Sequence, residues 1–242
     1  MENSTFGRLI GVLIAPGKTF RAIAESPTWL VAFLVVALSP LAASILAAPK
    51  MDWEGIVKAS IERMDVQVPQ EQLDQQIEIT KKFGGAMTYV FPLVLGILVL
   101  IIALVMWGAF TLAGGQPGYK RSLAVTAHAF MPLALSSILS IPVILGLDTI
   151  GAEIAETGTY LFSNLAVFAP EGTGPVMMAL LSKIDVFTIW IVILLAIGFH
   201  HSAKVKAKTS AITVVALWLV LWVGISVGFA ALGAMMAGRA SG

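Results

Sequence analysis

Residues 93–107, LVLGILVLIIALVMW, decide the fold class of this chain, because they form a long apolar run without a single charged side chain. A bilayer core about 30 Å thick requires ~20 apolar residues in a helix that rises about 1.5 Å per residue. Extended to about Met87–Ala113, the run is long enough to cross a membrane. Lipid offers no partner for backbone N–H and C=O groups, so we expect this segment to be helical.

Four other apolar segments reach or approach the same length, so we predict an all-α, polytopic membrane protein with five transmembrane helices. The fourth segment is the shortest, and we expect Ile184 and Asp185 to extend it. The five predicted spans are Trp29–Ala48, Met87–Ala113, Leu123–Leu147, Val186–Phe199 and Ala211–Met236.

The composition of the chain supports the same class. Hydrophobic residues make up 58% of the 242 positions and charged residues only 12%, whereas soluble domains carry roughly a quarter charged residues. A soluble fold of this size would lack the ionic groups to cover its surface. The absence of cysteine excludes disulfides, thiolate metal sites and cysteine nucleophiles. A formal net charge of +1 gives no indication of nucleic-acid binding.

Lysine and arginine are concentrated in three short segments, which all lie on one side of the membrane if the spans number five. Short loops rich in basic residues stay in the cytoplasm. We therefore expect a multi-pass protein of the cell inner (cytoplasmic) membrane, with the N-terminus cytoplasmic and the C-terminus outside. The eight basic residues of these segments are Arg8, Lys18, Arg21, Lys120, Arg121, Lys204, Lys206 and Lys208.

Residues 1–28 form an N-terminal amphipathic interfacial segment ahead of the predicted transmembrane domain, 29–242. Pro16 divides the segment into two helical pieces, and Arg8 lies off the apolar face of the first piece. One interpretation is a basic amphipathic helix on the cytoplasmic leaflet; the other is an ordinary helix packed under the bundle. The apolar positions are Phe6, Leu9, Ile10, Leu13 and Ile14, followed by Phe20 and Ile23.

Two long loops interrupt the transmembrane domain on the predicted outer side. The polar outer insertion, 49–84, holds two amphipathic patterns separated by VQVP at 66–69, which predicts an outer helical hairpin. We interpret the hairpin as a solvated support for the first two spans, with a partner-binding surface as the alternative. The second outer loop, 148–183, has apolar pieces too short to span, which favours re-entrant or interfacial pieces over a sixth span.

Two ionisable side chains at the predicted membrane depth carry functional hypotheses. His128 lies four residues before Pro132, which removes the helical donor of the His128 carbonyl. A polar kink could line a pathway for protons or metal; we favour a histidine hydrogen-bonded to a neighbouring helix. Asp185 opens the fourth span, where capping of the helix N-terminus is favoured over coordination of an ion.

Prolines and small residues mark where the predicted helices bend and pack. The expected kinks are at Pro40, Pro92, Pro132 and Pro142. Small residues at four-residue spacing allow close helix contacts, which we expect within the bundle. They are Ser39, Ala43 and Ala47 in the first span and Gly224 and Gly228 in the fifth.

Motifs of enzyme chemistry are missing from the sequence. It contains no phosphate-cradling glycine-rich loop followed by Lys-Ser/Thr, no HExxH and no serine elbow. The predicted spans offer almost no paired carboxylates or histidines for a membrane hydrolase. We therefore expect a protein that is not an enzyme and that holds no cofactor and no metal.

Three stretches carry a family resemblance. The run APGKTFRAIAESPTWLVAFLV (15–35) resembles the opening of bacterial members of the Yip (Ypt-interacting protein) membrane family. The stretches GGQPGYKRSLAVTAHAFMPLALSSIL (114–139) and KIDVFTIWIVILLAIGF (183–199) resemble its second connection with the proline-kinked third span, and its fourth span. The resemblance implies five spans with a cytoplasmic N-terminus. It supplies no catalytic residues, and the insertion at 51–83 matches no part of the pattern.

These observations predict a non-enzymatic membrane scaffold or organiser that acts through lipid and protein contacts. The expected partners are the lipid bilayer and either further copies of the chain or other membrane proteins, without nucleic acid. The alternative is a small channel or secondary transporter that uses the proline-kinked third span with His128 and Asp185.

Overall fold

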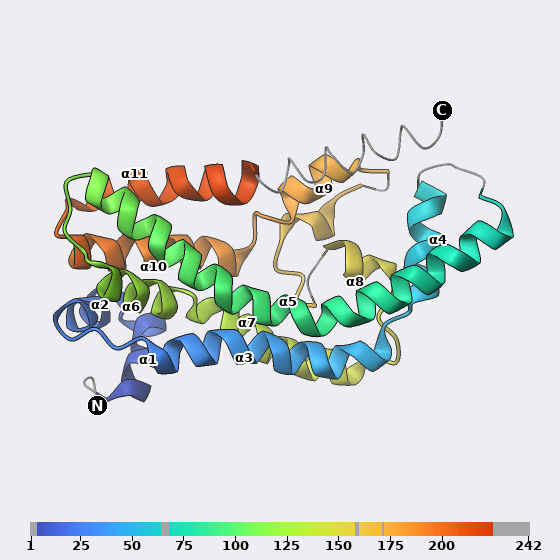
Figure 1. Cartoon of the computed structure of the whole chain (residues 1–242), viewed down its shortest axis with the longest axis horizontal. Helices are drawn as coiled ribbons and strands as arrows, with labels where there is room; N and C mark the ends of the chain where they lie inside the picture. Colours follow the sequence, from blue (N-terminus) through green and yellow to red (C-terminus); the bar gives the residue numbers. More distant parts are fainter. Residues whose placement is uncertain (1–3, 64–67, 158–159, 171, 225–242) are drawn as a thin grey trace.

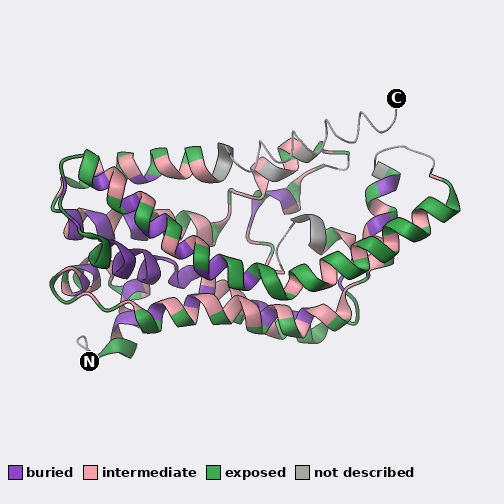
Figure 2. Ribbon diagram, in the orientation of Figure 1, coloured by how far each residue is buried: buried purple, intermediate pink, exposed green. Residues whose placement is uncertain are grey.

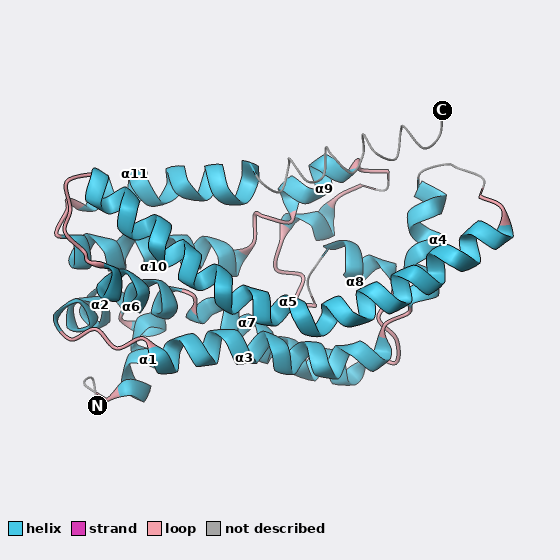
Figure 3. Ribbon diagram, in the orientation of Figure 1, coloured by secondary structure: helices cyan, strands magenta, loops and turns pink. Residues whose placement is uncertain are grey.

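The computed structural model of this chain describes residues 4–63, 68–157, 160–170 and 172–224. Within these ranges it is helical, with two isolated β-bridges and no strand (Figure 3). The predicted all-α fold is confirmed for the described part of the chain. The elements are α1 (Thr5–Ile14), α2 (Pro16–Glu25), α3 (Leu30–Ala47), η1 (Ala48–Lys50), α4 (Trp53–Arg63), α5 (Gln70–Leu112), α6 (Tyr119–Ala129), α7 (Met131–Gly146), α8 (Ala152–Thr157), η2 (Leu165–Phe168), α9 (Pro175–Leu181), α10 (Val186–Ala203), α11 (Ala207–Trp218) and η3 (Leu219–Gly224).

Among the described residues, three helical stretches are long and apolar enough to cross a membrane. They are Leu30–Lys50, Gln70–Leu112 and Tyr119–Gly146, the last formed by α6 and α7 together. They correspond to the first three predicted spans, which supports a multi-pass membrane protein. The fourth and fifth predicted spans correspond to shorter apolar helices, so the count of five stays a prediction. From residue 225 on, the predicted fifth span lies outside the described residues.

The long helices form an elongated bundle (Figure 1). Helix α3 lies along α7 and contacts α5, while α10 packs against α6, α7 and α11. Helix α5 crosses the bundle obliquely and extends beyond it to reach α4 (Figure 1). The short elements α4, α8 and α9 gather at this extended end, which we call the loop end, and α1 and α2 lie at the opposite, N-terminal end.

The predicted outer hairpin differs from the structure in its second arm. Helix α4 is the first arm, but the second arm is not a separate helix, since α5 runs without a break over 43 residues into the second span. Gly84 and Gly85, which lie between the polar insertion and the second predicted span in the sequence, lie within α5. A Cβ on Gly84 would lie 2.5 Å from the Trp53 ring, so this glycine lets α4 approach α5 closely, which offsets its low helix propensity.

The third predicted span is interrupted at Phe130, between α6 and α7. Pro132 has no N–H and occupies the first turn of α7, where a helical donor is not needed. The Phe130 amide donates to the Thr126 carbonyl at 3.1 Å, and the Leu133 amide donates to the Phe130 carbonyl at 3.0 Å. Pro40, Pro92 and Pro142 lie inside α3, α5 and α7 without ending them, and the bends expected there stay predictions.

The three basic segments meet at the N-terminal end of the bundle (Figure 1). Helix α2 packs against α10 and α6. The connection between α5 and α6 reaches the end of α10, where the Gln116 amide donates to the Ala203 carbonyl at 3.3 Å. The structure thus places the predicted cytoplasmic segments at one end, and the side of the membrane that this end faces stays a prediction.

Candidate functional site

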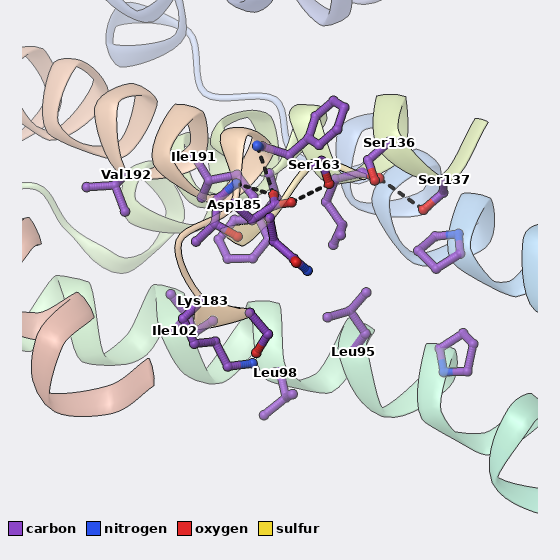
Figure 4. A pocket seen from close by; sticks show the side chains of 18 of the residues that line it. Leu95, Leu98, Ile102, Ser136, Ser137, Ser163, Lys183, Asp185, Ile191 and Val192 are labelled. Atoms are coloured by element: carbon purple, nitrogen blue, oxygen red, sulfur yellow. Dashed lines mark hydrogen bonds between the residues drawn. The ribbon is translucent and has the colours of Figure 1, made fainter. Parts of the chain in front are cut away.

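A cavity of about 470 Å³ lies between α3, α5, α7, α10 and α11, and we call it the central cavity (Figure 4). Apolar side chains form its long walls. They come from α5 and α10 in particular: Leu95, Leu98, Ile102, Met106, Ile191, Val192 and Leu195. A mainly apolar space with a few polar groups is typical of sites that bind small or amphipathic molecules.

Polar groups line the central cavity where the loop before α10 enters the helix. Asp185 is the N-cap of α10, and its carboxylate accepts from the amides of Phe187 at 2.9 Å and Thr188 at 3.0 Å. The Ser163 hydroxyl donates to the other carboxylate oxygen (Figure 4). An isolated bridge between Asn164 and Asp185 ties the loop to the start of α10. These bonds match the capping interpretation of Asp185.

Lys183 precedes Asp185 by two residues and also lines the central cavity, where Figure 4 shows it on the side of Ile102 and Leu98. Partial burial lowers the pKa of its ammonium group below the usual value. The cavity lining therefore contains the amine of Lys183 and the helix-capping carboxylate of Asp185, two residues apart in the chain.

On α7, serine hydroxyls face the same space. Ser136, Ser137 and Ser140 line the cavity. The Ser137 hydroxyl donates to the Leu133 carbonyl and the Ser140 hydroxyl donates to the Ser136 carbonyl, each at 2.9 Å. Such bonds to the preceding turn satisfy the hydroxyl protons inside an apolar helix, while the oxygens keep acceptor capacity.

The Trp218 indole is a further polar group at the cavity. Trp218 lies at the end of α11, and its Nε1 is buried without a hydrogen-bond partner. An unsatisfied buried donor is unusual in proteins, so Trp218 brings an unpaired indole N–H to the residues around the cavity.

His128 lies in a different pocket, at the N-terminal end of the bundle. This pocket has a volume of about 330 Å³ and is lined by the segment before α3, the first turn of α3 and two residues of α6. The His128 side chain is 1% exposed. Its Nδ1 bonds to the Ala124 carbonyl at 2.8 Å. This bond lies within its own helix and not across to a neighbouring helix as the sequence predicts, because the i−4 carbonyl is within reach of the ring.

The structure brings some of the predicted residues together and separates others. Asp185, Pro40, Ala43 and Pro92 all line the central cavity, whereas His128 does not. The two ionisable groups of the transport hypothesis thus belong to separate pockets. Pro132, Pro142, Ser39 and Ala47 line neither pocket, Gly224 is the last described residue, and Gly228 lies outside the described residues.

The small residues of the first span contact α7. Ala43 and Ala47 are buried in a cluster with Ile144 and Ile150. The Ser39 hydroxyl donates to the Val35 carbonyl at 2.7 Å, within its own helix. Ser39, the polar residue of the predicted small-residue face, therefore has its hydroxyl donor paired within its own helix.

Sequence reasoning missed several polar residues of the cavity. Ser163 and Asn164 lie in a loop without a recognisable pattern, and their position depends on the bridge to Asp185. Lys183 stands two residues before the cap, and this proximity to Asp185 was the one available signal. Within the described ranges, no group of three histidine or acidic side chains forms a metal site.

Comparison with known proteins identifies the family. A family model described as the Yip1 domain matches residues 10–228. A curated relative, the membrane protein YknW of Bacillus subtilis (strain 168), is 29% identical over 215 residues, which cover 88% of this chain and 86% of the relative. No solved structure matches the chain significantly. The family match covers most of the chain, as the resemblance in the sequence predicted, and the chain belongs to the Yip1 domain family.

Proposed function

We propose that this protein is a non-enzymatic membrane scaffold or organiser that acts through contacts with lipids and with other membrane proteins. One observation carries the proposal. Helix α1 exposes Phe6, Ile10 and Ile14, which are 70%, 46% and 77% exposed, at four-residue spacing along one face. We call these three residues the α1 stripe.

The opposite face of α1 is fixed to the bundle. Leu9 and Val12 are buried in the main core together with Phe20 and Ile23 of α2. The Arg8 guanidinium donates to the Ser26 carbonyl at 2.6 Å and to the Thr28 hydroxyl at 3.0 Å, just before α3 begins. The two interpretations of the N-terminal segment are therefore compatible: one face packs under the bundle, and the other is available to lipid.

An apolar helix face held in this way suits insertion into one leaflet. An amphipathic helix buries its apolar side about 5–10 Å into the boundary between headgroups and acyl chains. Since α1 and α2 are attached to the spans, the inserted face of α1 would take up area in one leaflet only, at each place in the membrane where a copy of the protein lies. This is a physical route by which a protein without catalytic groups organises the surrounding membrane.

Spin labelling tests the insertion. The chain has no native cysteine, so an Ile10→Cys variant in proteoliposomes carries one label. We expect this label to collide more with oxygen, which concentrates in the acyl region, than with a water-soluble nickel chelate. An Arg21→Cys variant at an exposed site on α2 is the control, and its label should favour the chelate. A label at position 10 that favours the chelate would overturn the proposal.

The shape of the membrane tests the organising role. We expect electron cryomicroscopy of proteoliposomes with wild-type protein to show smaller or more deformed vesicles than empty liposomes. A variant with Phe6→Ser, Ile10→Ser and Ile14→Ser should lose most of this effect at equal protein density. Identical vesicles for the wild type and the variant would argue against organisation through the α1 stripe.

Transport is the second candidate, and the broken third span favours it. Phe130, at the break, lines the central cavity, and His128, two residues earlier, lines the other pocket. A proteoliposome flux assay over protons and several ions, with wild type and His128→Ala, tests this candidate. Flux that requires His128 would show that a scaffold is not the whole function. Flux no higher than in empty liposomes would exclude transport of the solutes tested.

A further inference from the structure

The pocket that contains His128 has the chemistry of a headgroup site, and we call it the headgroup pocket. Its cationic and polar lining comes from Lys120, His128, Thr28 and Thr5, and among the residues that the structure describes no acidic side chain lines it. The remaining lining residues are Pro27, Trp29, Leu30, Val31 and Ala32. Lys120 is exposed, so its ammonium group is free to adjust to a ligand at the pocket.

His128 provides an unpartnered polar atom inside this lining. Its Nδ1 lies 2.8 Å from the Ala124 carbonyl oxygen, and a carbonyl accepts only, so Nδ1 carries the proton of this bond. In the neutral ring Nε2 is then an acceptor. It is buried without a partner, in a residue that is 1% exposed and lines the pocket. A ligand with a hydroxyl group would satisfy it.

Donors for an anion surround the same space. Helix α3 begins in the pocket wall, and its N-cap residue, Trp29, provides no side-chain cap for the first-turn amides. These amides and the positive end of the helix dipole attract a phosphate group. The Thr28 oxygen accepts from Arg8, so its own hydroxyl proton is available to donate. Arg8 thereby orders one wall of the pocket without lining it.

The apolar part of the lining indicates which kind of phosphate compound fits. Leu30 and Val31 are 53% and 43% exposed, and both line the pocket at the start of the first span. An acyl chain that follows α3 would cover them, while its headgroup lies at the end of the helix, at the depth where headgroups of the bilayer lie. A soluble phosphate compound would leave this apolar surface in water.

We propose that the headgroup pocket binds one anionic phospholipid whose headgroup carries a hydroxyl, such as phosphatidylglycerol. Lys120, the Thr28 hydroxyl and the first-turn amides of α3 hold the phosphate. His128 Nε2 accepts from the headgroup hydroxyl. The inference deepens the proposed function, since it names the lipid class, and it rests on that function in placing this end of the bundle at a membrane surface.

Native mass spectrometry of the full chain in detergent tests the proposal, with added lipids of matched acyl chains. We expect phosphatidylglycerol to bind about tenfold more tightly than phosphatidylcholine, which lacks a net charge, consistent with basic pockets that select anionic lipids. Phosphatidylethanol has the same singly charged phosphodiester without a headgroup hydroxyl, and we expect it to bind more weakly than phosphatidylglycerol. Glycerol 3-phosphate supplies the soluble source of the same phosphate chemistry and should not compete at similar concentrations.

Variants connect the binding to the pocket. Lys120→Gln should weaken phosphatidylglycerol binding about fivefold, and Lys208→Gln, an exposed lysine outside the pocket lining, should leave it unchanged. His128→Phe should weaken the binding of phosphatidylglycerol but not that of phosphatidylethanol, with His201→Phe as its control. If His128→Phe fails to fold, Lys120→Gln and Thr28→Val, both at exposed positions, keep the test decisive.

Each contrary result would refute one part of the proposal. If phosphatidylglycerol and phosphatidylcholine bound equally, or if Lys120→Gln left binding unchanged, the pocket would not be a site for anionic lipid. Equal binding of phosphatidylglycerol and phosphatidylethanol would overturn the role of His128. If glycerol 3-phosphate competed at equal affinity, the ligand of the pocket would be a soluble phosphate compound and not a lipid. The two proposals can fail separately. A lipid-exposed label at position 10 together with no preference for phosphatidylglycerol would refute this inference and leave the proposed function standing. A preference for phosphatidylglycerol together with a water-exposed label at position 10 would support this inference and refute the proposed function.

Discussion

The two ends of the bundle differ in how tightly their side chains pack (Figure 2). At the N-terminal end, Phe20, Phe110 and Phe199 are fully buried, and the rings of Phe110 and Phe199 stack with centroids 4.5 Å apart. Toward the loop end, α5 exposes Ile79 and Phe83, at 65% and 66%. The central cavity opens among the helices between these regions. The N-terminal end is therefore built as a rigid support, and the loop end leaves space.

The contrast has a local cause in the size of the side chains. Gly198 of α10 lets Phe20 of α2 and Val125 of α6 approach its backbone, since a Cβ there would lie 3.0 Å and 2.5 Å from them. At the loop end α5 contacts the short helix α4, and α4 contacts the short helix α8. A region with dense apolar contacts resists local opening, and a region with few contacts adapts more readily. We therefore expect the N-terminal end to hold α1 firmly in place and the loop end to change shape more readily.

The largest effect should come from removing an aromatic ring at the N-terminal end. Phe20→Ala deletes a fully buried side chain, and we expect a loss of about 3–5 kcal/mol in the free energy of unfolding. Phe83→Ala, at a ring that is 66% exposed, should change it by less than about 0.5 kcal/mol. Unfolding in mixed micelles of mild detergent and dodecyl sulfate, followed by circular dichroism, measures both. Equal losses would refute the difference in packing.

A smaller effect is expected from adding one methyl group at the same end. Gly198→Ala forces the new Cβ against Val125 and Phe20, and overpacking of this kind costs about 1–3 kcal/mol. Gly108→Ala in α5 is the matched control, because nothing lies within 4 Å of its Cβ position. There alanine should be neutral or stabilise the helix by up to about 1 kcal/mol. The same assay measures both variants, and a stabilising Gly198→Ala would show that this end is less tightly packed than described.

Much of the fold could be predicted from patterns that act locally. Hydropathy located α3, and the proline at position 132 indicated the interruption of the third span. The continuity of α5 could not be predicted, because Gly84 and Gly85 are poor helix formers in isolation. Their place in a helix depends on Trp53, whose ring packs on Gly84 from a different element. Contacts of this kind between distant segments leave no periodicity in the sequence.

The candidate sites were predicted only in part, for a similar reason. Asp185 was recognisable because a carboxylate before an apolar helix has a local role as a cap. His128 stood out as an ionisable residue in an apolar span, but its separation from Asp185 depends on the arrangement of the helices. Lys183 and Ser163 join the cavity through a loop whose course is set by the bridge to Asp185. Local chemistry thus identifies single residues, and tertiary contacts decide which of them share a site.

The smallest effect is expected at the central cavity, where the loop before α10 is held by a cap rather than by packing. Asp185→Ala removes the acceptor of the Phe187 and Thr188 amides and of the Ser163 hydroxyl, and loss of an N-cap costs about 1 kcal/mol. Asp185→Asn keeps an acceptor of the same shape and should retain most of the stability. If alanine instead costs as much as Phe20→Ala, the loop before α10 is a structural core in its own right, and the contrast between the two ends fails. If asparagine behaves like alanine, the charge of the carboxylate is what matters, and the helix dipole or Lys183 becomes the partner to test next.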